Sequence, residues 1–404
     1  MQFNKRRVPL FLMGLGLAIG LASCGGNGPE AEGIKAILAE AEKMTEEELH
    51  TAALEEIADG KLVAYSQTSG TAKALAGFKE KYNIDYDEEA AKSTKKDYEL
   101  YTALDIVSTG KYYADMVMIQ DSRSLGQYMD EDLIVNYTPG DLAQHMDDAD
   151  ENPQACLFLN KIFTYRKNVA DAPDLNNVWQ LAGTEADANH IKGLSFQSPR
   201  TENINRNFLF QLASPEAVAD LTAAYQSYYG KAYVEEAAYP NIGYKFIAEF
   251  IKNITSYHGS DTTAARSTLP ADTTGTIFYL GYNKIKDLAN SLPGGYDEAD
   301  EIMAFDHNVE GFKGYMYKMY TVIPTTAKYP LASALFIRYC LTQEGFEAGW
   351  GGQRGYYSAN TTVPLAEGDL PLDYWKDQLL TEDEDYLKGV RDSLQSFINA
   401  QLLG

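Results

Sequence analysis

The sequence contains little cysteine and little histidine. Three of its 404 residues are cysteines: Cys24 stands alone near the start, and Cys156 and Cys340 each lie among apolar residues. Two cysteines in so long a chain make no disulfide framework, so we expect buried free thiols. A single bridge between Cys156 and Cys340 is the alternative, which the sequence does not decide. The five histidines lie far apart, and no cluster has the spacing of a zinc site.

Motifs for nucleophilic catalysis and nucleotide binding are also missing. The sequence has no GxSxG elbow, and no predicted strand leads into GxGxxG or GxxxxGKS/T. The acidic segment 147–152, "DDADEN", lacks the glycine and the distal glutamate of a calcium loop. Catalytic triads can assemble from distant residues, so these absences do not exclude an enzyme. Because these motifs are missing, nothing in the sequence supports a catalytic role, a metal site or a cofactor, and we predict none of the three.

Basic residues are few compared with acidic ones. The chain has 34 lysines and arginines against 58 aspartates and glutamates, which gives a formal net charge of −24. Nucleic acid would repel such a chain, because binding to it rests on Lys and Arg contacts to phosphate. We therefore predict no nucleic-acid partner. The charge suits a soluble extracytoplasmic protein and mildly favours a cationic or neutral ligand, although most of these carboxylates are expected simply to solvate the surface.

An apolar run over 8–22 follows three basic residues near the start of the chain. It is shorter than the ~20 residues of a bilayer-spanning helix, and it ends in small residues as a secretory signal peptide does. Its end, "LASC", resembles the bacterial lipobox, in which the chain is cut before the cysteine and the cysteine is lipidated. We predict a signal peptide over 1–23, a lipidated Cys24 and a flexible tether over 24–44. An ordinary signal peptide or an uncleaved anchor is the alternative.

Strand-like and helix-like segments alternate along most of the remaining chain. Thr45 and Glu48 form the capping box of a first helix, and the apolar strand "KLVAYS" follows at 61–66. Further strand candidates are "ADMVMIQ", "IKGLSFQ" and "GTIFYLGY", with helical segments between them. Such alternation predicts an α/β fold with a largely parallel sheet.

Four segments resemble, in their order, motifs of one bacterial family. They are "EEELHTAALEEIADGKLVAYS", "YYADMVMIQDSRSL", "NNVWQLAG" with "IKGLSFQSP", and "YPLASALFIRYCLTQEGFEAGWGGQRGYYSAN". The family is the extracellular solute-binding proteins of the iron, polyamine and phosphonate type, and the resemblance spans about 46–360. It implies a two-lobed type 2 periplasmic-binding fold of the α/β class. Each lobe would hold a mainly parallel sheet flanked by helices, and strands near 158–166 and 315–322 would cross between the lobes.

The resemblance also implies a role and a division of the chain. The protein would capture a small polar solute between its lobes and deliver it to the permease of an ABC importer. Lobe 1 would comprise 45–160 and 322–360, and lobe 2 would comprise 161–321 and 361–404. We expect a monomer that a lipid anchor holds outside the bacterial cytoplasm, in the periplasm or at the cell surface. A sensor-feeding protein of the same fold and a surface-anchored glycan hydrolase with paired carboxylates are the alternatives.

The candidate binding residues follow the predicted strands. Ligands of open α/β sheets bind outside the carboxyl ends of the strands, where helix N-termini offer free N–H groups. The residues at these places are Ser66, Gln67, Thr68, Ser69, Asp121, Ser122, Ser198, Arg200, Thr201, Asn203, Tyr279, Tyr282 and Asn283. Each hydroxyl can alternatively serve as a helix cap.

The ligand stays open, with a small polar organic solute first and a ferric ion second. Iron-binding members of the family use adjacent tyrosines just after the strand that matches "TIFYLGY", whereas here Tyr282 is followed by Asn283. Asp121 would suit a polyamine, and Arg200 beside a helix start would suit a carboxylate or a phosphonate.

Overall fold

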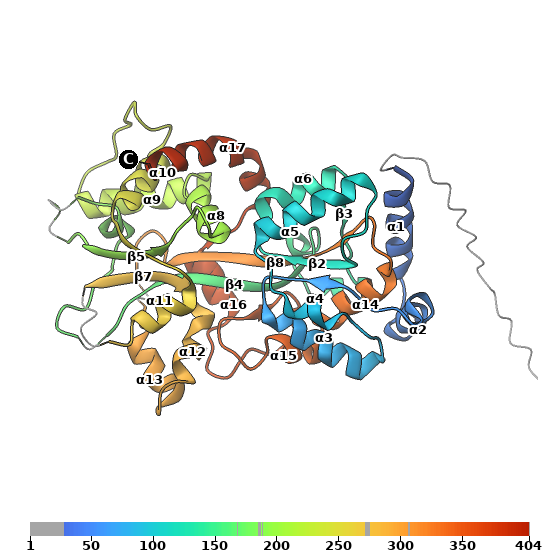
Figure 1. The fold of residues 1–404 in the computed structure, drawn as a ribbon. Coiled ribbons are helices and arrows are strands. Elements are labelled where there is room, and N and C mark those ends of the chain that lie inside the picture. Colours follow the sequence, from blue (N-terminus) through green and yellow to red (C-terminus); the bar gives the residue numbers. More distant parts are fainter. Residues whose placement is uncertain are drawn as a thin grey trace, which may run out of the picture.

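The computed structural model describes residues 28–167, 169–184, 187, 189–270, 275–305 and 308–403. Figure 1 shows two lobes of helices and strands joined by two long strands, β4 (Ala155–Thr164) and β8 (Gly314–Pro324). The predicted signal peptide and Cys24 lie outside the described residues. Within the described ranges, no helix combines the length and the apolar character needed to cross a membrane.

One mixed sheet runs through both lobes in the order β1-β2-β8-β4-β7-β5-β6. In the first lobe β1 is parallel to β2, and in the second lobe β5 is parallel to both β6 and β7. The long strands β4 and β8 pair antiparallel with each other and with their outer neighbours. The shorter strands are β1 (Ala64–Tyr65), β2 (Met116–Ile119), β3 (Ile134–Val135), β5 (Gly193–Gln197), β6 (Ile254–His258), β7 (Thr276–Gly281), β9 (Tyr357–Ser358) and β10 (Leu380–Thr381). The predicted α/β fold, with parallel strands in each lobe and strands crossing between the lobes, is confirmed.

Helices cover the sheet of the first lobe. Thr45 and Glu48 form the predicted capping box: Thr45 Oγ1 accepts from the Glu48 N–H (3.3 Å), and Glu48 Oε2 accepts from the Thr45 N–H (2.9 Å). The helices of this lobe are α1 (Gly28–Ala41), α2 (Glu46–Ile57), α3 (Ser69–Tyr82), α4 (Glu88–Lys92), α5 (Asp97–Leu104), α6 (Leu125–Asp130), α7 (Gly140–Ala143), α14 (Pro330–Cys340) and α15 (Gln343–Gly349). The thiols of Cys156 and Cys340 are both buried and free in this lobe.

The second lobe is built around a cluster of aromatic rings. Tyr279 on β7 lies between Phe196 on β5 and Phe208, with ring centroids 5.1 and 4.8 Å away. The helices of this lobe are α8 (Asn203–Gln211), α9 (Pro215–Tyr229), α10 (Ile242–Lys252), α11 (Asp261–Ser267), α12 (Ile285–Ala289) and α13 (Gly295–Ile302). Strand β6 is absent from the strands predicted from the sequence.

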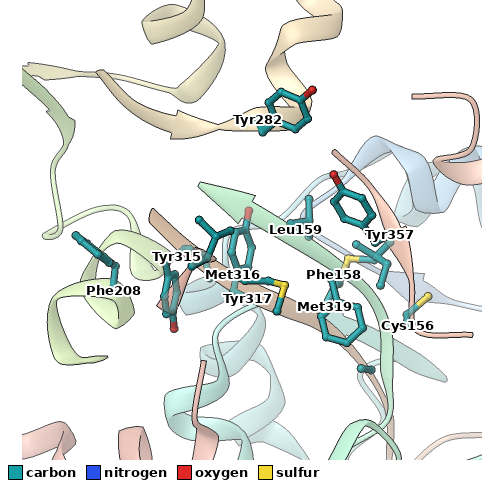
Figure 2. Close-up of a cluster of buried hydrophobic side chains, with 14 of the residues drawn as sticks. Cys156, Phe158, Leu159, Phe208, Tyr282, Tyr315, Met316, Tyr317, Met319 and Tyr357 are labelled. Atoms are coloured by element: carbon teal, nitrogen blue, oxygen red, sulfur yellow. The ribbon is translucent and has the colours of Figure 1, made fainter. Parts of the chain in front are cut away.

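The crossing strands are buried along their whole length. Figure 2 shows Phe158 and Leu159 of β4 close to Tyr317 and Met319 of β8 in one apolar cluster. At the start of β8, a Cβ on Gly314 would lie 2.0 Å from the carbonyl oxygen of Lys161, so the two strands approach too closely there for any other residue. The strands therefore form a rigid floor that both lobes share.

The first helix corrects one expectation. The sequence predicted a flexible tether over 24–44, but Gly28–Ala41 forms α1, which packs against α14 and β3. Ile34, Leu38 and Ala41 of this helix belong to the main hydrophobic core. These residues recur at helical spacing, so α1 buries an apolar stripe that the glycines around it obscured in the sequence.

The last helix touches both lobes. After α16 (Leu372–Gln378) and β10, which pairs with β8, the chain enters α17 (Glu384–Gln401). This helix packs against α8 and α10 of the second lobe, and against α6 and the 3₁₀ turn η2 (Ser122–Ser124) of the first. In Figure 1 it lies in dark red above α8 and α10 of the second lobe and reaches the edge of the first. The segment 361–404, predicted to belong to lobe 2, thus contacts both.

We expect Leu38→Ala to lower the free energy of unfolding by about 2–5 kcal/mol, because it opens a cavity where α1 meets the core. Leu54→Ala on α2 is the matched control, since the Leu54 side chain is 37% exposed and that of Leu38 only 1%. The control is expected to change the free energy by about 0.5 kcal/mol or less. Denaturant unfolding measures both, and equally small effects would show that α1 is not part of the core.

Candidate functional site

A cavity of about 710 Å³ lies between the two lobes. Loops at residues 67–69 and 94–99 wall it on the side of the first lobe, and loops at 201–203 and 259–262 wall it on the side of the second. The crossing strands form its floor, and Trp350 and Tyr356 close one end. Its volume lies within the range of small-molecule sites, about 300–1,000 Å³.

Several helices of both lobes begin at the wall of the cavity. Thr68 caps α3 by accepting from the Gly70 N–H (2.9 Å), and Ser260 caps α11 by accepting from the Thr263 N–H (3.1 Å). Helices α5 and α8 begin at the cavity wall as well. The reason is topological: these helices follow or adjoin the carboxyl ends of parallel strands, and those ends face the cleft.

The floor carries a fixed polar group on an otherwise apolar surface. Lys161 of β4 stands between Leu157, Leu159 and Tyr317 in the cavity lining. Its ammonium group donates to Asn205 Oδ1 (2.7 Å) and lies 3.2 Å from Asp261 Oδ1. Both partners belong to the second lobe, so Lys161 is held in place before any ligand enters.

Two further polar side chains in the cavity lining are those of Gln67 and Asp97. The Nε2 and Oε1 atoms of Gln67 are shielded from solvent, and neither has a hydrogen-bond partner among the described residues. Asp97 accepts from the backbone N–H groups of Gln120 (3.1 Å) and Asp121 (3.3 Å). Burial, with the nearby charges of Asp121 and Glu202, raises the pKa of Asp97 well above its usual range. Buried polar groups without partners are costly, so Gln67 is suited to bond a ligand.

Charge is balanced in the main cavity, unlike in the chain as a whole. Its lining contains four lysines and four carboxylates, namely Lys95, Lys96, Lys161, Lys284, Asp97, Glu99, Glu202 and Asp261. The net charge of the chain therefore does not describe its cleft. In the part of the chain that the structure describes, no group of three or more His, Cys, Asp or Glu side chains could hold a metal ion.

Six of the thirteen residues predicted to bind the solute line this cavity. They are Gln67, Thr68, Ser69, Thr201, Asn203 and Asn283. The structure brings them together from three loops, although their contact with a solute remains a prediction. The remaining seven lie outside the lining.

Three of those seven serve as turn or cap residues or lie exposed. Ser66 Oγ accepts from the Thr68 N–H (3.2 Å), and Ser198 Oγ accepts from the Arg200 N–H (3.4 Å). Arg200 is exposed and donates to the carbonyl oxygen of Leu402 (2.9 Å) at the end of the chain. The two serines thus form turns and cap no helix, whereas Thr68 is the cap of α3.

The other four are buried. Asp121 turns away from the cavity because Arg123 Nη2 lies 2.7 Å from its Oδ2 in a buried ion pair. Ser122 is buried beside it, and Tyr279 lies in the aromatic core. Tyr282 packs against Trp375, with ring centroids 5.2 Å apart. The positions of the strand ends thus did not predict which of these side chains reach the cavity, because the direction of each side chain depends on its packing.

The sequence analysis missed three parts of the cavity. Residues 94–99 are absent from the predicted binding residues, and the crossing strands were expected without their inward-facing side chains. The loop 259–262 was missed because β6 was missed. "ITSYH" followed by "GSD" offered a signal, since a β-rich run before a Ser cap is typical of a strand leading into a helix.

A buried polar network at β8 joins the lobes. Asn207 of α8 donates from Nδ2 to Asp121 Oδ1 (3.1 Å) and to Glu382 Oε2 (3.2 Å). The hydroxyls of Tyr315 and Tyr320 on β8 donate to Glu382 at 2.7 and 3.2 Å. Burial, together with the charge of Glu384, raises the pKa of Glu382 to about 8, while the hydrogen bonds from Tyr315 and Asn207 act in the opposite direction.

Comparison with solved structures decides the fold. The Trichodesmium protein FutA (IdiA), in complex with iron and citrate, matches with a TM-score of 0.59 and 14% identity over 85% of this chain and 99% of its own. AfuA from Actinobacillus pleuropneumoniae, a periplasmic binding protein with fructose-6-phosphate bound, matches with a TM-score of 0.60 and 15% identity over 85% of this chain and 99% of its own. MotA from A. tumefaciens B6, in complex with glucopine, matches with a TM-score of 0.58 and 11% identity over the same shares.

This chain has the type 2 periplasmic-binding fold. The fold was expected from the resemblance of its sequence motifs and is confirmed by nearly full coverage of the compared structures. No protein-family model matches the sequence, and no curated protein matches it. In this fold the cavity described above is the cleft between the lobes, and β4 and β8 are its crossing strands.

Glu382 predicts a pH dependence of stability. Because its pKa is raised from 4.5 to about 8, the folded state binds more protons than the unfolded state between these values. The free energy of unfolding should therefore fall as pH rises through this window, by up to about 1.4 kcal/mol for each pH unit. We expect Glu382→Gln to reduce this slope, to which Glu56, whose pKa burial raises to about 7, also contributes. Denaturant unfolding at several pH values measures it, and wild type below pH 4.5 is the internal control, since the group is then neutral in both states. An unchanged slope in the variant would contradict the assignment.

Proposed function

We propose that the protein is an extracytoplasmic solute-binding protein that captures a small polar solute between its lobes and delivers it to an ABC importer. One observation carries the proposal: a cavity of the size of a solute lies between the lobes. Loops of both lobes and the two crossing strands line it. A ligand placed there contacts both lobes at once, so its binding favours a closed arrangement over an open one.

The compared structures support this role. AfuA holds fructose-6-phosphate, MotA holds glucopine, and FutA holds iron and citrate, so this fold accommodates solutes of several kinds. We favour a polar organic solute, because the cavity walls here are hydroxyl, amide and charged groups. The ferric-ion alternative has less support, since Tyr282 is buried against Trp375 and does not line the cavity.

The cellular setting is part of the proposal. We infer that the chain is cut before Cys24, that this cysteine is lipidated, and that the protein works as a monomer outside the cytoplasm. Two acyl chains or more hold a soluble domain firmly at a membrane surface. Because α1 already packs on the first lobe, the tether would be shorter than the sequence suggested. We propose no catalytic role, which leaves the hydrolase alternative unsupported.

The function is tested by thermal unfolding of the purified protein against sugars, sugar phosphates, amino acids, carboxylates, polyamines and ferric salts. A solute that binds only the folded state raises its stability by about 4 kcal/mol at a thousandfold excess over the dissociation constant. We expect one class to raise the unfolding midpoint and to be recovered unchanged. Turnover of the bound compound would contradict a pure binding role, and no shift with any class would argue against solute capture.

Gln67→Ala gives a residue-level prediction for the same cleft. Loss of the Gln67 amide should weaken binding of the solute that the panel identifies by about 10–100-fold, because the ligand loses hydrogen bonds in a desolvated site. Stability without solute should not fall, since the amide has no partner within the described protein. Gln343→Ala is the control: its amide donates to Glu347 (2.7 Å) on an exposed face of α15, and its loss should leave affinity unchanged. Equal affinities of the two variants, measured by calorimetric titration, would place the solute elsewhere.

A further inference from the structure

A second, smaller cavity of about 130 Å³ adjoins the main cleft. We call it the side pocket. It lies between α3 of the first lobe and the segment of the second lobe formed by the 3₁₀ turn η5 (Tyr282–Lys284) and α12. The residues that it shares with the main cavity are Thr68, Ser69, Asn283, Lys284, Trp350 and Tyr356. A solute in the main cleft can therefore extend one group into it.

The side pocket is basic in a chain that is otherwise strongly acidic. Its charged residues are Lys73 from α3, Lys284 from η5, and Lys286 and Asp287 from α12. Lys161 in the main cavity is paired with Asp261, but no ion pair is found for the three side-pocket lysines within the described ranges. Among the described residues these lysines thus have no direct ion-pair partner, and Asp287 is the single carboxylate in the pocket lining.

The three lysines also face one another. Burial lowers the pKa of Lys286, and the charges of Lys73 and Lys284 lower it further. Lys73 belongs to the first lobe, while Lys284 and Lys286 belong to the second. The charge of Asp287 raises the pKa of Lys286 and so offsets part of this effect, and its Oδ2 also accepts a hydrogen bond from Thr262 Oγ1 (3.1 Å). An unliganded cleft therefore holds like charges on opposite walls.

We propose that the side pocket binds the anionic group of the solute, so that the solute is a small organic anion whose polar remainder occupies the main cleft. This inference rests on the proposed function. An anion supplies the counter-charge that the three lysines lack, and charge-assisted hydrogen bonds to ammonium groups are among the stronger ones. The first turn of α3, a helix of 14 residues capped by Thr68, adds N–H groups at the junction of the two cavities.

The same geometry couples the anion to closure of the lobes. Without an anion, Lys73 on one lobe repels Lys284 and Lys286 on the other as the lobes approach. An anionic group between them attracts both walls, so the closed state gains from the anion while the open state gains little. A cationic group would add to the repulsion, which excludes a polyamine from this pocket.

Calorimetric titration at constant ionic strength tests the inference with four probes: glucose 6-phosphate, gluconate, glucose and inorganic phosphate. We expect the organic anions to bind at least about tenfold more tightly than glucose. The first two probes distinguish a phosphate from a carboxylate as the preferred group. Inorganic phosphate should shift the NMR signals of the Lys286 side chain, whether or not the sugar part fits the main cleft.

The matched variants are the triple change Lys73→Gln, Lys284→Gln, Lys286→Gln and the single change Lys252→Gln, on the exposed end of α10. The triple variant should lose about 100-fold in affinity for the anionic probe, and its affinity for glucose should fall far less. Lys252→Gln should change neither. X-ray scattering should show contraction with the anion in the wild type and none in the triple variant.

The inference is overturned if inorganic phosphate leaves the Lys286 signals unchanged and no organic anion binds better than glucose. The proposed function would survive that result if a neutral or cationic solute of the wider panel raised the unfolding midpoint. Binding of an anion that the triple variant retains in full would likewise overturn it, because the anion would then bind away from the three lysines.

Discussion

The antiparallel pairing of β4 with β8 is the constraint on which the rest of the structure depends. These strands are buried throughout, and each continues into the sheet of a lobe: β8 pairs with β2 in the first, and β4 with β7 in the second. Their close approach at Gly314 leaves no room for a side chain. Both lobes are therefore built outward from one shared floor, and a solute on that floor lies between them.

The polar side chains near the crossing strands differ in whether they already have hydrogen-bond partners. Toward the cleft, Lys161 is fixed by Asn205 and Asp261, while the unpartnered Gln67 lies on the neighbouring wall. Away from the cavity lining, Asn207 and Glu382 form part of a network that spans both lobes. Most groups of such a buried network have hydrogen-bond partners, and the network therefore fixes the positions of its side chains. The cleft wall, by contrast, presents groups that a ligand can still satisfy.

The distribution of charge explains how an acidic protein can present a basic site. Of the 58 acidic residues, Asp287 alone is in the described lining of the side pocket, which brings Lys73 of the first lobe together with Lys284 and Lys286 of the second. Net charge governs solubility and long-range repulsion, but a desolvated pocket responds to the few charges at its wall. The overall sign of the chain is thus a poor guide to the ligand.

The sequence by itself determined the alternation of strands and helices, the capping box of α2, the approximate course of β4 and β8, and the loops around Gln67, Thr201 and Asn283 that meet at the cleft. These follow from local rules, because side-chain periodicity and caps act within a few residues. Only the tertiary structure decided that α1 is core and no tether, that Asp121 and Tyr279 turn inward, and that Lys73 meets Lys284 and Lys286. Those outcomes depend on which distant segments pack together, and no spacing along the chain encodes that directly.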